Sequence, residues 1–358
     1  MTEARQFDLR SDTVTVPTSK MWSAMTGAKL GDDVYGEDPT VTELESLGAS
    51  MLGKECGLFL PSGTMGNQAS VMAHTSRGDE VIVDADSHIF YYEAGGLALL
   101  SGVQPRTISS DGGIMDPDRV RAAVRPDNLH CPRTALLCLE NTHNRAGGRV
   151  VPVAVMDALM EVALDAGIPV HVDGARIFNA ATALGVPAAR LVEKADSVMF
   201  CLSKGLSAPI GSVVVGSEEF IARARRSRKV LGGGMRQAGV IAAAGIVALE
   251  EMTGRLEEDH KMASRLVEEL AGTPGIALDP GTVETNMVML HIEHAGLTAQ
   301  GVVDALRRKG VLAHAPGPST IRLVTHKDLS MEDVLQAARL IREVMTESCD
   351  PGRSSLRR

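Results

Sequence analysis

The sequence predicts an α/β protein with a mostly parallel sheet, and two observations support that prediction. Short apolar runs of β type alternate with helical segments, at residues 80–85, 135–140, 168–173, 197–202 and 211–216. Strands that are apolar over their whole length are typical of a sheet covered by helices on both faces. At 358 residues the chain also exceeds one average domain, so we expect one large domain and one smaller domain.

The domains are predicted from the segments in chain order. Helical patterning begins near Val41, and a long helix from Gly239 to Gly272, apolar in its first half and amphipathic in its second, would connect the domains. Turns are predicted at Pro280 and at 316–318, before a final helix from Ser330 to Glu347. The predicted parts are an N-terminal arm (1–14), a large domain (15–246), a small α/β domain (247–347) and a tail expected to be disordered (348–358).

The charge of the chain argues against a nucleic-acid partner. The formal net charge is −9, whereas binding to a polyphosphate relies on a broad basic surface. One basic cluster is present, and we expect its arginines to lie on a solvated helix face; they are Arg223, Arg225, Arg226 and Arg228.

Cysteine usage and apolar run lengths indicate a soluble, cytoplasmic protein. The five cysteines show neither CxxC spacing nor a dense framework, so we expect them to be reduced. The first residues, MTEARQFDLRSD, contain no apolar segment of a secretory signal. The longest apolar stretch, Gly239 to Leu249, has 11 residues, short of the roughly 20 that a membrane-spanning helix requires.

A carboxylate and a lysine follow two neighbouring strand-like runs. Asp173 ends the run IPVHVD, and Ser203 and Lys204 enter a turn after DSVMFCL. Parallel strands would deliver both side chains to the same edge of the sheet. Pyridoxal 5′-phosphate (PLP) needs such a pair, a lysine for its Schiff base and a carboxylate that keeps the ring nitrogen protonated. Taken singly, Asp173 could instead cap the following helix, and Lys204 could be a solvated turn lysine.

A site for the cofactor phosphate is predicted at residues 58–74, which read as a strand, a small-residue turn and a helix. Ser62, Gly63 and Thr64 would present amide hydrogens and hydroxyls at the helix N-terminus, where unpaired donors attract an anion. The segment is not a Walker loop, and no GxGxxG follows a strand, so a mononucleotide site is disfavoured. No metal site is predicted.

Nine segments, read in order, resemble the L-threonine aldolases, PLP enzymes of the aspartate aminotransferase fold (fold type I). The resemblance covers roughly residues 7 to 345. The segments are DLRSDTVTVPT, GDDVYGEDPTVTELE, LPSGTMGNQ, DADSHI, LENTHNRAGGRVVP, HVDGARIFNA, CLSKGLSAPIGS, RRSRKVLGGGMRQAG and TNMVML.

The resemblance implies further cofactor contacts. His88 would stack on the pyridine ring and contact the substrate hydroxyl, and His130 is a second candidate near the β-substituent. Whether either histidine, or a water held by both, takes the hydroxyl proton stays open. Lys229 and Arg236, which flank the triple glycine 232–234, would reach the cofactor phosphate of a neighbouring subunit. The active sites would then be shared across a homodimer, which we expect to pair again into a tetramer.

A substrate carboxylate would need a clamp, for which guanidinium is suited because it is permanently charged and binds at two points. Arg176 and Arg322 are the two candidates, and Arg176 is also a candidate for cofactor binding. Ser11 resembles a further carboxylate contact. Tyr35 and Tyr92 are candidates for lining the pocket.

The resemblance implies retro-aldol cleavage of L-threonine or L-allo-threonine to glycine and acetaldehyde. Other reactions on the same scaffold remain possible, namely those of a phenylserine aldolase, a β-eliminating lyase, an aminotransferase or a serine hydroxymethyltransferase. A catalytically idle PLP-fold protein would usually lack the lysine, and Lys204 is present. After the other PLP reactions and the idle PLP-fold protein, the third alternative is an α/β protein that binds a nucleotide. The sequence does not determine the configuration preferred at Cβ.

Overall fold

The computed structural model describes residues 5–350, which form two compact units. The large unit comprises residues 17–254, and the small unit joins residues 5–16 to residues 255–350. The sequence predicted domain boundaries after residues 14 and 246, whereas the two units divide after residues 16 and 254. The predicted domain boundaries stay predictions. Residues 1–4 of the predicted arm and 351–358 of the predicted tail lie outside the described residues.

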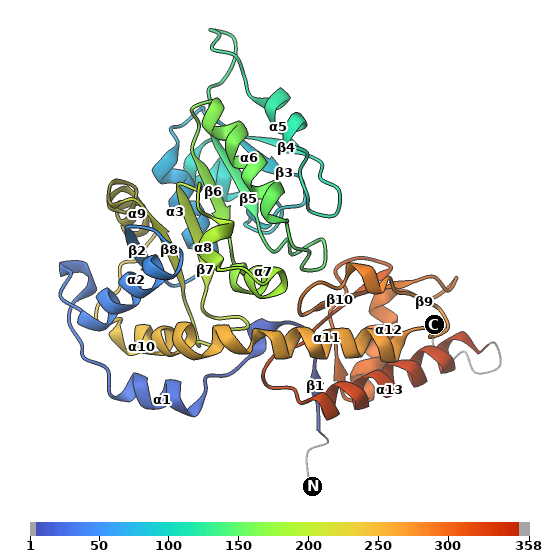
Figure 1. The fold of residues 1–358 in the computed structure, drawn as a ribbon. Helices are drawn as coiled ribbons and strands as arrows, with labels where there is room; N and C mark the ends of the chain where they lie inside the picture. The colour runs from blue at the N-terminus through green and yellow to red at the C-terminus, as the bar shows by residue number, and fades with distance from the viewer. Residues whose placement is uncertain (1–4, 351–358) are drawn as a thin grey trace. The chain divides into compact units, whose positions relative to one another are not determined.

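The large unit is built on a seven-stranded sheet with the order β2-β8-β7-β6-β5-β3-β4 (Figure 1). Neighbouring strands from β7 to β4 are parallel, whereas β8 is antiparallel to both β7 and β2. Every residue of the five strands from β8 to β3 is buried, so both faces of this part of the sheet are covered, as predicted. The strands are β2 (Cys56–Leu60), β3 (Glu80–Asp84), β4 (Gln104–Ile108), β5 (Thr134–Glu140), β6 (Val170–Asp173), β7 (Ser197–Cys201) and β8 (Ser212–Gly216).

Helices pack on this sheet in groups. Helix α3 packs on α9 and on β7 and β8, while α6 packs on α5 and α8 (Figure 1). The α-helices are α1 (Ser19–Thr26), α2 (Pro39–Met51), α3 (Gly63–His74), α4 (His88–Tyr91), α5 (Pro117–Ala123), α6 (Val153–Asp165), α7 (Ile177–Leu184), α8 (Ala188–Leu191), α9 (Glu218–Val230) and α10 (Gly239–Val247). Shorter helical segments are η2 (Asp33–Tyr35), η3 (Leu97–Ser101), η4 (Ala248–Met252) and η5 (Thr253–Arg255).

The parallel strands bring polar side chains to one edge of the sheet. Strand β3 ends at Asp84, β5 at Glu140 and β6 at Asp173, and the turn that contains Lys204 follows β7. Because the carboxyl ends of parallel strands meet at the same edge, residues from four separate segments converge there.

The predicted long helix from Gly239 to Gly272 is interrupted. Helix α10 passes into the π-helical segment η4 and the 3₁₀ segment η5, and α11 begins at Leu256. The hydrogen-bond pattern therefore changes three times between Val247 and Leu256, and the two units divide after Gly254 in this stretch.

The small unit contains an antiparallel sheet, β12-β10-β9, and a separate parallel pair, β1-β11. Its apolar core includes residues of α11, α12 and α13 and of both sheets. The final helix α13 reaches two residues further than predicted, so Ser348 and Cys349 belong to it and not to a disordered tail. The elements are β1 (Phe7–Asp8), η1 (Asp12–Val14), α11 (Leu256–Leu270), β9 (Ile276–Ala277), η6 (Pro280–Thr282), β10 (Met287–Ile292), α12 (Ala299–Arg308), β11 (Val311–Leu312), β12 (Thr320–Val324) and α13 (Met331–Cys349).

Candidate active site

Asp173 and Lys204 leave neighbouring parallel strands, as the sequence predicted. Strands β6 and β7 pair in parallel, with Asp173 opposite Met199. Lys204 lies half-buried in the turn after β7, where its carbonyl accepts a 2.8 Å hydrogen bond from the amide of Ser207. Ser203, also half-buried, precedes it in the same turn. The amine and the carboxylate therefore belong to the same edge of the sheet.

Asp173 is buried and accepts two hydrogen bonds. Its Oδ1 accepts from the backbone N–H of Ala175 at 3.0 Å, and its Oδ2 accepts from Nδ2 of Asn67 at 2.7 Å. The first bond stabilises the turn before α7, whose N-cap residue is the buried Arg176. The second bond comes from α3, an element far away in sequence. Asp173 thus does more than support the turn into the next helix.

A second buried carboxylate, Glu93, was missed in the sequence. Its Oε1 lies 3.0 Å from Nδ1 of His88 and 2.8 Å from Nδ2 of Asn67, and its Oε2 accepts from Gln68 at 2.6 Å. The side chain of Glu93 is fully buried. Three polar side chains therefore surround this carboxylate.

His88 stands between charges of both signs. Burial opposes its protonation, but the hydrogen bond to Glu93 and the negative charges of Asp173 and Glu93 outweigh burial and the nearby positive charge of Lys204, so the pKa of His88 is raised. Its backbone N–H donates to Glu140 at 2.5 Å. Burial, together with the charge of Asp173, raises the pKa of the Glu140 carboxyl.

An oxygen or nitrogen atom from each of His88, Glu93 and Asp173 lies within 4.8 Å of the others, the spacing of a possible cation site. The amide of Asn67 donates to both carboxylates, so hydrogen bonds account for this clustering.

Tyr92 lies beside His88, at the exposed side of the cluster. Their ring centroids are 5.5 Å apart, and Tyr92 Oη accepts from Arg145 at 3.2 Å. The guanidinium of Arg145 also lies 3.8 Å from the ring centroid of Tyr91. His88 and Arg145 therefore both contact Tyr92, the residue predicted to line the pocket.

The predicted phosphate site is a helix N-terminus. Ser62 is the N-cap of α3, with its hydroxyl accepting from the amide of Met65 at 3.2 Å, and Ser62 and Thr64 are exposed. A Cβ on Gly63 would lie 2.9 Å from Sγ of Cys201, so glycine lets the helix start directly against β7. The first turn of α3 thus adjoins the strand that leads to Lys204.

Other candidates from the sequence lie outside this hydrogen-bonded cluster. His130 lies in an exposed turn, where its amide donates to Asn128, and Tyr35 is 75% exposed in η2. Arg236 pairs with Asp32 at 3.0 Å. The site roles of His130, Tyr35 and Arg236 remain predictions.

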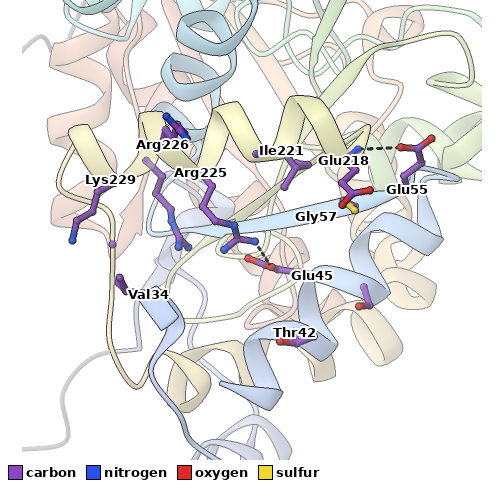
Figure 2. Close-up of a pocket in the computed structure, with 15 residues that line it drawn as sticks. Val34, Thr42, Glu45, Glu55, Gly57, Glu218, Ile221, Arg225, Arg226 and Lys229 are labelled. Atoms are coloured by element: carbon purple, nitrogen blue, oxygen red, sulfur yellow. Dashed lines mark hydrogen bonds and ion pairs between the residues drawn. The ribbon is translucent and has the colours of Figure 1, made fainter. Parts of the chain in front are cut away.

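Lys229 lines a pocket of about 650 Å³ between α9, α2 and β2 (Figure 2). Arg225 reaches across this pocket to Glu45 at 2.8 Å, as Figure 2 shows. The prediction of a solvated face is wrong for Arg228, which is buried, pairs with Asp33 at 2.8 Å and donates to the carbonyl of Phe59 at 2.7 Å.

In the small unit, Arg322 and the segment that contains Ser11 are neighbours. Arg322 lies half-buried on β12, opposite Met289, and its guanidinium donates to the carbonyl of Arg10 at 3.4 Å. Ser11 is the next residue after Arg10 in the sequence, and it is the N-cap of η1. The two predicted carboxylate contacts of this unit therefore lie close in space.

Among the described residues, no helix has both the length and the apolar character needed to cross a membrane.

Comparisons with known proteins agree on a family. The model of the beta-eliminating lyase family matches residues 8–295. The chain is similar to low-specificity L-threonine aldolase 1 of Arabidopsis thaliana, with 46% identity over 98% of this chain and 99% of that protein. Low-specificity L-threonine aldolase of Escherichia coli K12 is 42% identical over 92% of this chain and 97% of its own length.

A solved structure of Leishmania major threonine aldolase superposes with a TM-score of 0.82 at 16% identity, covering 95% of this chain and 99% of that one. At this identity the likeness shows the fold alone. The fold is that of the fold type I PLP enzymes, as predicted.

Proposed function

Because the chain belongs to the beta-eliminating lyase family, with low-specificity L-threonine aldolases as its full-length relatives, we propose that it cleaves L-threonine and L-allo-threonine to glycine and acetaldehyde, with PLP as cofactor. It is a carbon–carbon lyase acting on β-hydroxy-α-amino acids. The single observation that carries the proposal is the pair Asp173 and Lys204 at the carboxyl ends of neighbouring parallel strands, with His88 near both charges.

The donor set fits this cofactor. A half-buried amine, a buried carboxylate, an imidazole and an anion-attracting helix N-terminus all belong to one edge of the sheet. When bound, PLP supplies a cationic ring that withdraws electrons from the substrate Cα. Lys204 would hold the cofactor through its amine, and Asp173 would hold a proton on the ring nitrogen.

The phosphate would be held at the start of α3 by the amides and hydroxyls of Ser62, Gly63 and Thr64, assisted by Ser203. None of these residues carries a positive charge. Lys229 and Arg236 of a neighbouring subunit would supply that charge, and the resulting shared site requires a homodimer, which we expect to pair into a tetramer.

His88 would receive the proton of the β-hydroxyl group, directly or through a water, and His130 remains a second candidate. With Nδ1 bonded to Glu93, the basic nitrogen of neutral His88 is Nε2. The carboxylate of Glu93 fixes the ring and stabilises the cation that forms on proton uptake, as an orienting carboxylate does for a general-base histidine.

The substrate carboxylate would be clamped by Arg322, with Ser11 as a further contact. The proposal is supported by their proximity in the small unit and by the fork geometry of guanidinium. Arg176 is the alternative clamp, and Tyr35 and Tyr92 would line the pocket. Holding the carboxylate would fix the orientation of the substrate Cα and so select which of its bonds breaks.

A cytoplasmic location is part of the proposal. All five cysteines are free, and two of them, Cys138 and Cys201, are buried in strands. Free cysteines are typical of a reducing compartment.

The test is the variant Lys204→Ala. We expect kcat to fall by about a thousandfold or more, because the amine that holds the cofactor is lost. Wild type should release glycine and acetaldehyde in equal amounts, without keto acid or ammonia. Lys194→Ala, which removes an exposed lysine paired with Glu161, is the control and should keep full activity.

Substantial turnover by Lys204→Ala, together with cofactor trapped by borohydride in that variant, would contradict the assignment. Comparing kcat/KM for L-threonine, L-allo-threonine and a β-phenylserine in wild type identifies the preferred substrate.

A further inference from the structure

A chain of polar side chains crosses the interior of the large unit behind Asp173. Nε2 of His74 lies 2.8 Å from Oγ of Ser197, which lies 2.9 Å from Nδ1 of His171. Nε2 of His171 lies 3.0 Å from Oδ1 of Asn67, whose Nδ2 reaches Asp173 at 2.7 Å. Ser197, His171 and Asn67 have no exposed surface. Buried polar groups at these distances form one connected network.

The chemistry of its members fixes the direction of this chain. Both N–H groups of Asn67 donate to carboxylates, those of Asp173 and Glu93, so its Oδ1 accepts. Burial lowers the pKa of His171 to about 4, so the ring is neutral and carries one proton, which must lie on Nε2 to donate to Asn67. Nδ1 then accepts from the hydroxyl of Ser197.

The hydrogen bonds at the far end of this network, at Ser197 and His74, run in the same direction. The hydroxyl hydrogen of Ser197 is committed to His171, so its oxygen accepts from Nε2–H of His74. Burial lowers the pKa of His74 to about 3, so this ring is also neutral. Every donor therefore points towards the two carboxylates, and the hydrogen bonds polarise one another in a single sense.

The amide of Asn67 links the two buried carboxyl groups of the site. Asp173 and Glu93 are buried carboxyl groups whose oxygens need hydrogen-bond donors in the interior. One amide donates to both, at 2.7 and 2.8 Å, and so fixes the position of one oxygen of each carboxyl group. His171 prevents the amide from rotating, because rotation would leave Oδ1 facing the carboxylates.

We propose that Asn67, fixed by His171, is a positioning residue that holds the carboxylate of Asp173 in place and aims it at the ring nitrogen of the cofactor. The inference rests on the proposed function, because it assigns Asp173 to that nitrogen. Each carboxylate oxygen of Asp173 keeps a second lone pair for the ring N–H while it accepts its protein hydrogen bond.

The test compares two cofactors in cofactor-free full-length protein. One is PLP, and the other is 1-deazapyridoxal 5′-phosphate, in which carbon replaces the ring nitrogen. The ratio of their dissociation constants isolates the contact to the ring nitrogen, because a general loss of structure weakens both. The variants are Asn67→Leu, His171→Leu, His171→Gln and Asp173→Asn. Gln68→Met is the matched control, because it removes a buried amide that donates to Glu93.

We expect wild type to prefer PLP and Asp173→Asn to lose the preference. Asn67→Leu should reduce it about tenfold to a hundredfold, the size of one charge-assisted hydrogen bond. His171→Leu should reduce it about threefold to tenfold, since the amide remains but can rotate. His171→Gln, which can still donate to Asn67, should recover most of the loss, and Gln68→Met should keep the wild-type ratio.

A wild-type ratio in Asn67→Leu, with the ratio lost in Asp173→Asn, overturns the inference and leaves the proposed function standing. An equal loss for both cofactors in Asn67→Leu means a purely structural role and also overturns it. If wild type shows no preference for PLP, or Asp173→Asn keeps the preference, the assignment of Asp173 in the proposed function fails and the inference fails with it.

Neutron diffraction from the wild-type protein decides the question if Asn67→Leu does not fold. We expect deuterium on Nε2 and none on Nδ1 of His171. Deuterium on Nδ1 would mean that the ring does not orient Asn67 as inferred.

Discussion

Glu93 is a carboxylate held in the interior by three side chains: Asn67, Gln68 and His88 each bond to it. Its charge is one of the causes that raise the pKa of His88 above the ordinary value of about 6.5. Protonated His88 therefore adds stability that is fully present below pH 6.5 or so and is lost as the pH rises through its raised pKa.

The pH dependence of catalysis tests this coupling. If neutral His88 accepts the hydroxyl proton, kcat/KM should fall as the pH drops through the raised pKa. Glu93→Gln removes the negative charge, so the pKa should fall and the acid limb of the profile should move to lower pH. Glu161→Gln, at an exposed carboxylate, is the control and should leave the limb in place. An unmoved limb in Glu93→Gln would show that another group titrates there.

The sequence predicted residues that end a strand or follow one closely, and it missed two residues that lie further from a strand, Glu93 in the turn after α4 and Asn67 inside α3. Asp173, Lys204 and the segment before His88 each follow an apolar run, so strand pairing alone places them. Glu93 comes after α4 and has no strand next to it. Asn67 was assigned only to the phosphate-binding helix, although its burial among neighbours on α3 is typical of a face turned towards the sheet.

In helix α9, the sequence contained a signal for the burial of Arg228 that the prediction did not use. Ile221, Ala224 and Arg228 are buried and recur at the spacing of one helix face. The arginine was predicted on the solvated side because charged residues are seldom buried, yet Asp33 pairs with it and the carbonyl of Phe59 accepts from it. Periodicity would have placed it correctly, whereas its partners come from segments too distant in sequence to be recognised.

The contact between α3 and β7 depends on a glycine. A Cβ on Gly66 would lie 2.7 Å from Cγ of Met199 and 3.1 Å from Cγ2 of Val214, so the helix would have to move away from the sheet. Gly66→Ala should therefore lower the free energy of unfolding by about 1–2 kcal/mol, despite the better helix propensity of alanine. Chemical denaturation measures this change.

Two comparisons control for this result. Gly27→Ala, where the new Cβ would make ordinary contacts at 3.4 Å and beyond, should change stability by less than about 0.5 kcal/mol. Gly66→Ala combined with Met199→Ala should cost less than the sum of the single changes, because the second removes the crowded atom. Additive costs would locate the strain elsewhere.

At the scale of the whole molecule, a shared active site can be tested by mixing chains. Under conditions that exchange subunits, inactive Lys204→Ala and inactive Arg236→Ala chains should regain about a quarter of wild-type activity, because one site in each hybrid dimer has both groups. Lys204→Ala mixed with Asp173→Asn is the control and should regain none, since both groups belong to one chain's site. Hybrid dimers that form without recovered activity would contradict a shared site.

Because β1 pairs with β11, this pair can form only after most of the chain has been translated. Phe7 and Asp8 are among the first described residues to leave the ribosome, yet their partners are Val311 and Leu312. The whole large unit, residues 17–254, lies between these segments, so it can complete its sheet during translation before β1 can pair with β11. Phe7 and Leu9 belong to the apolar core of the small unit. Until translation reaches residue 311, both side chains lack the strand and much of the core that bury them in the folded protein.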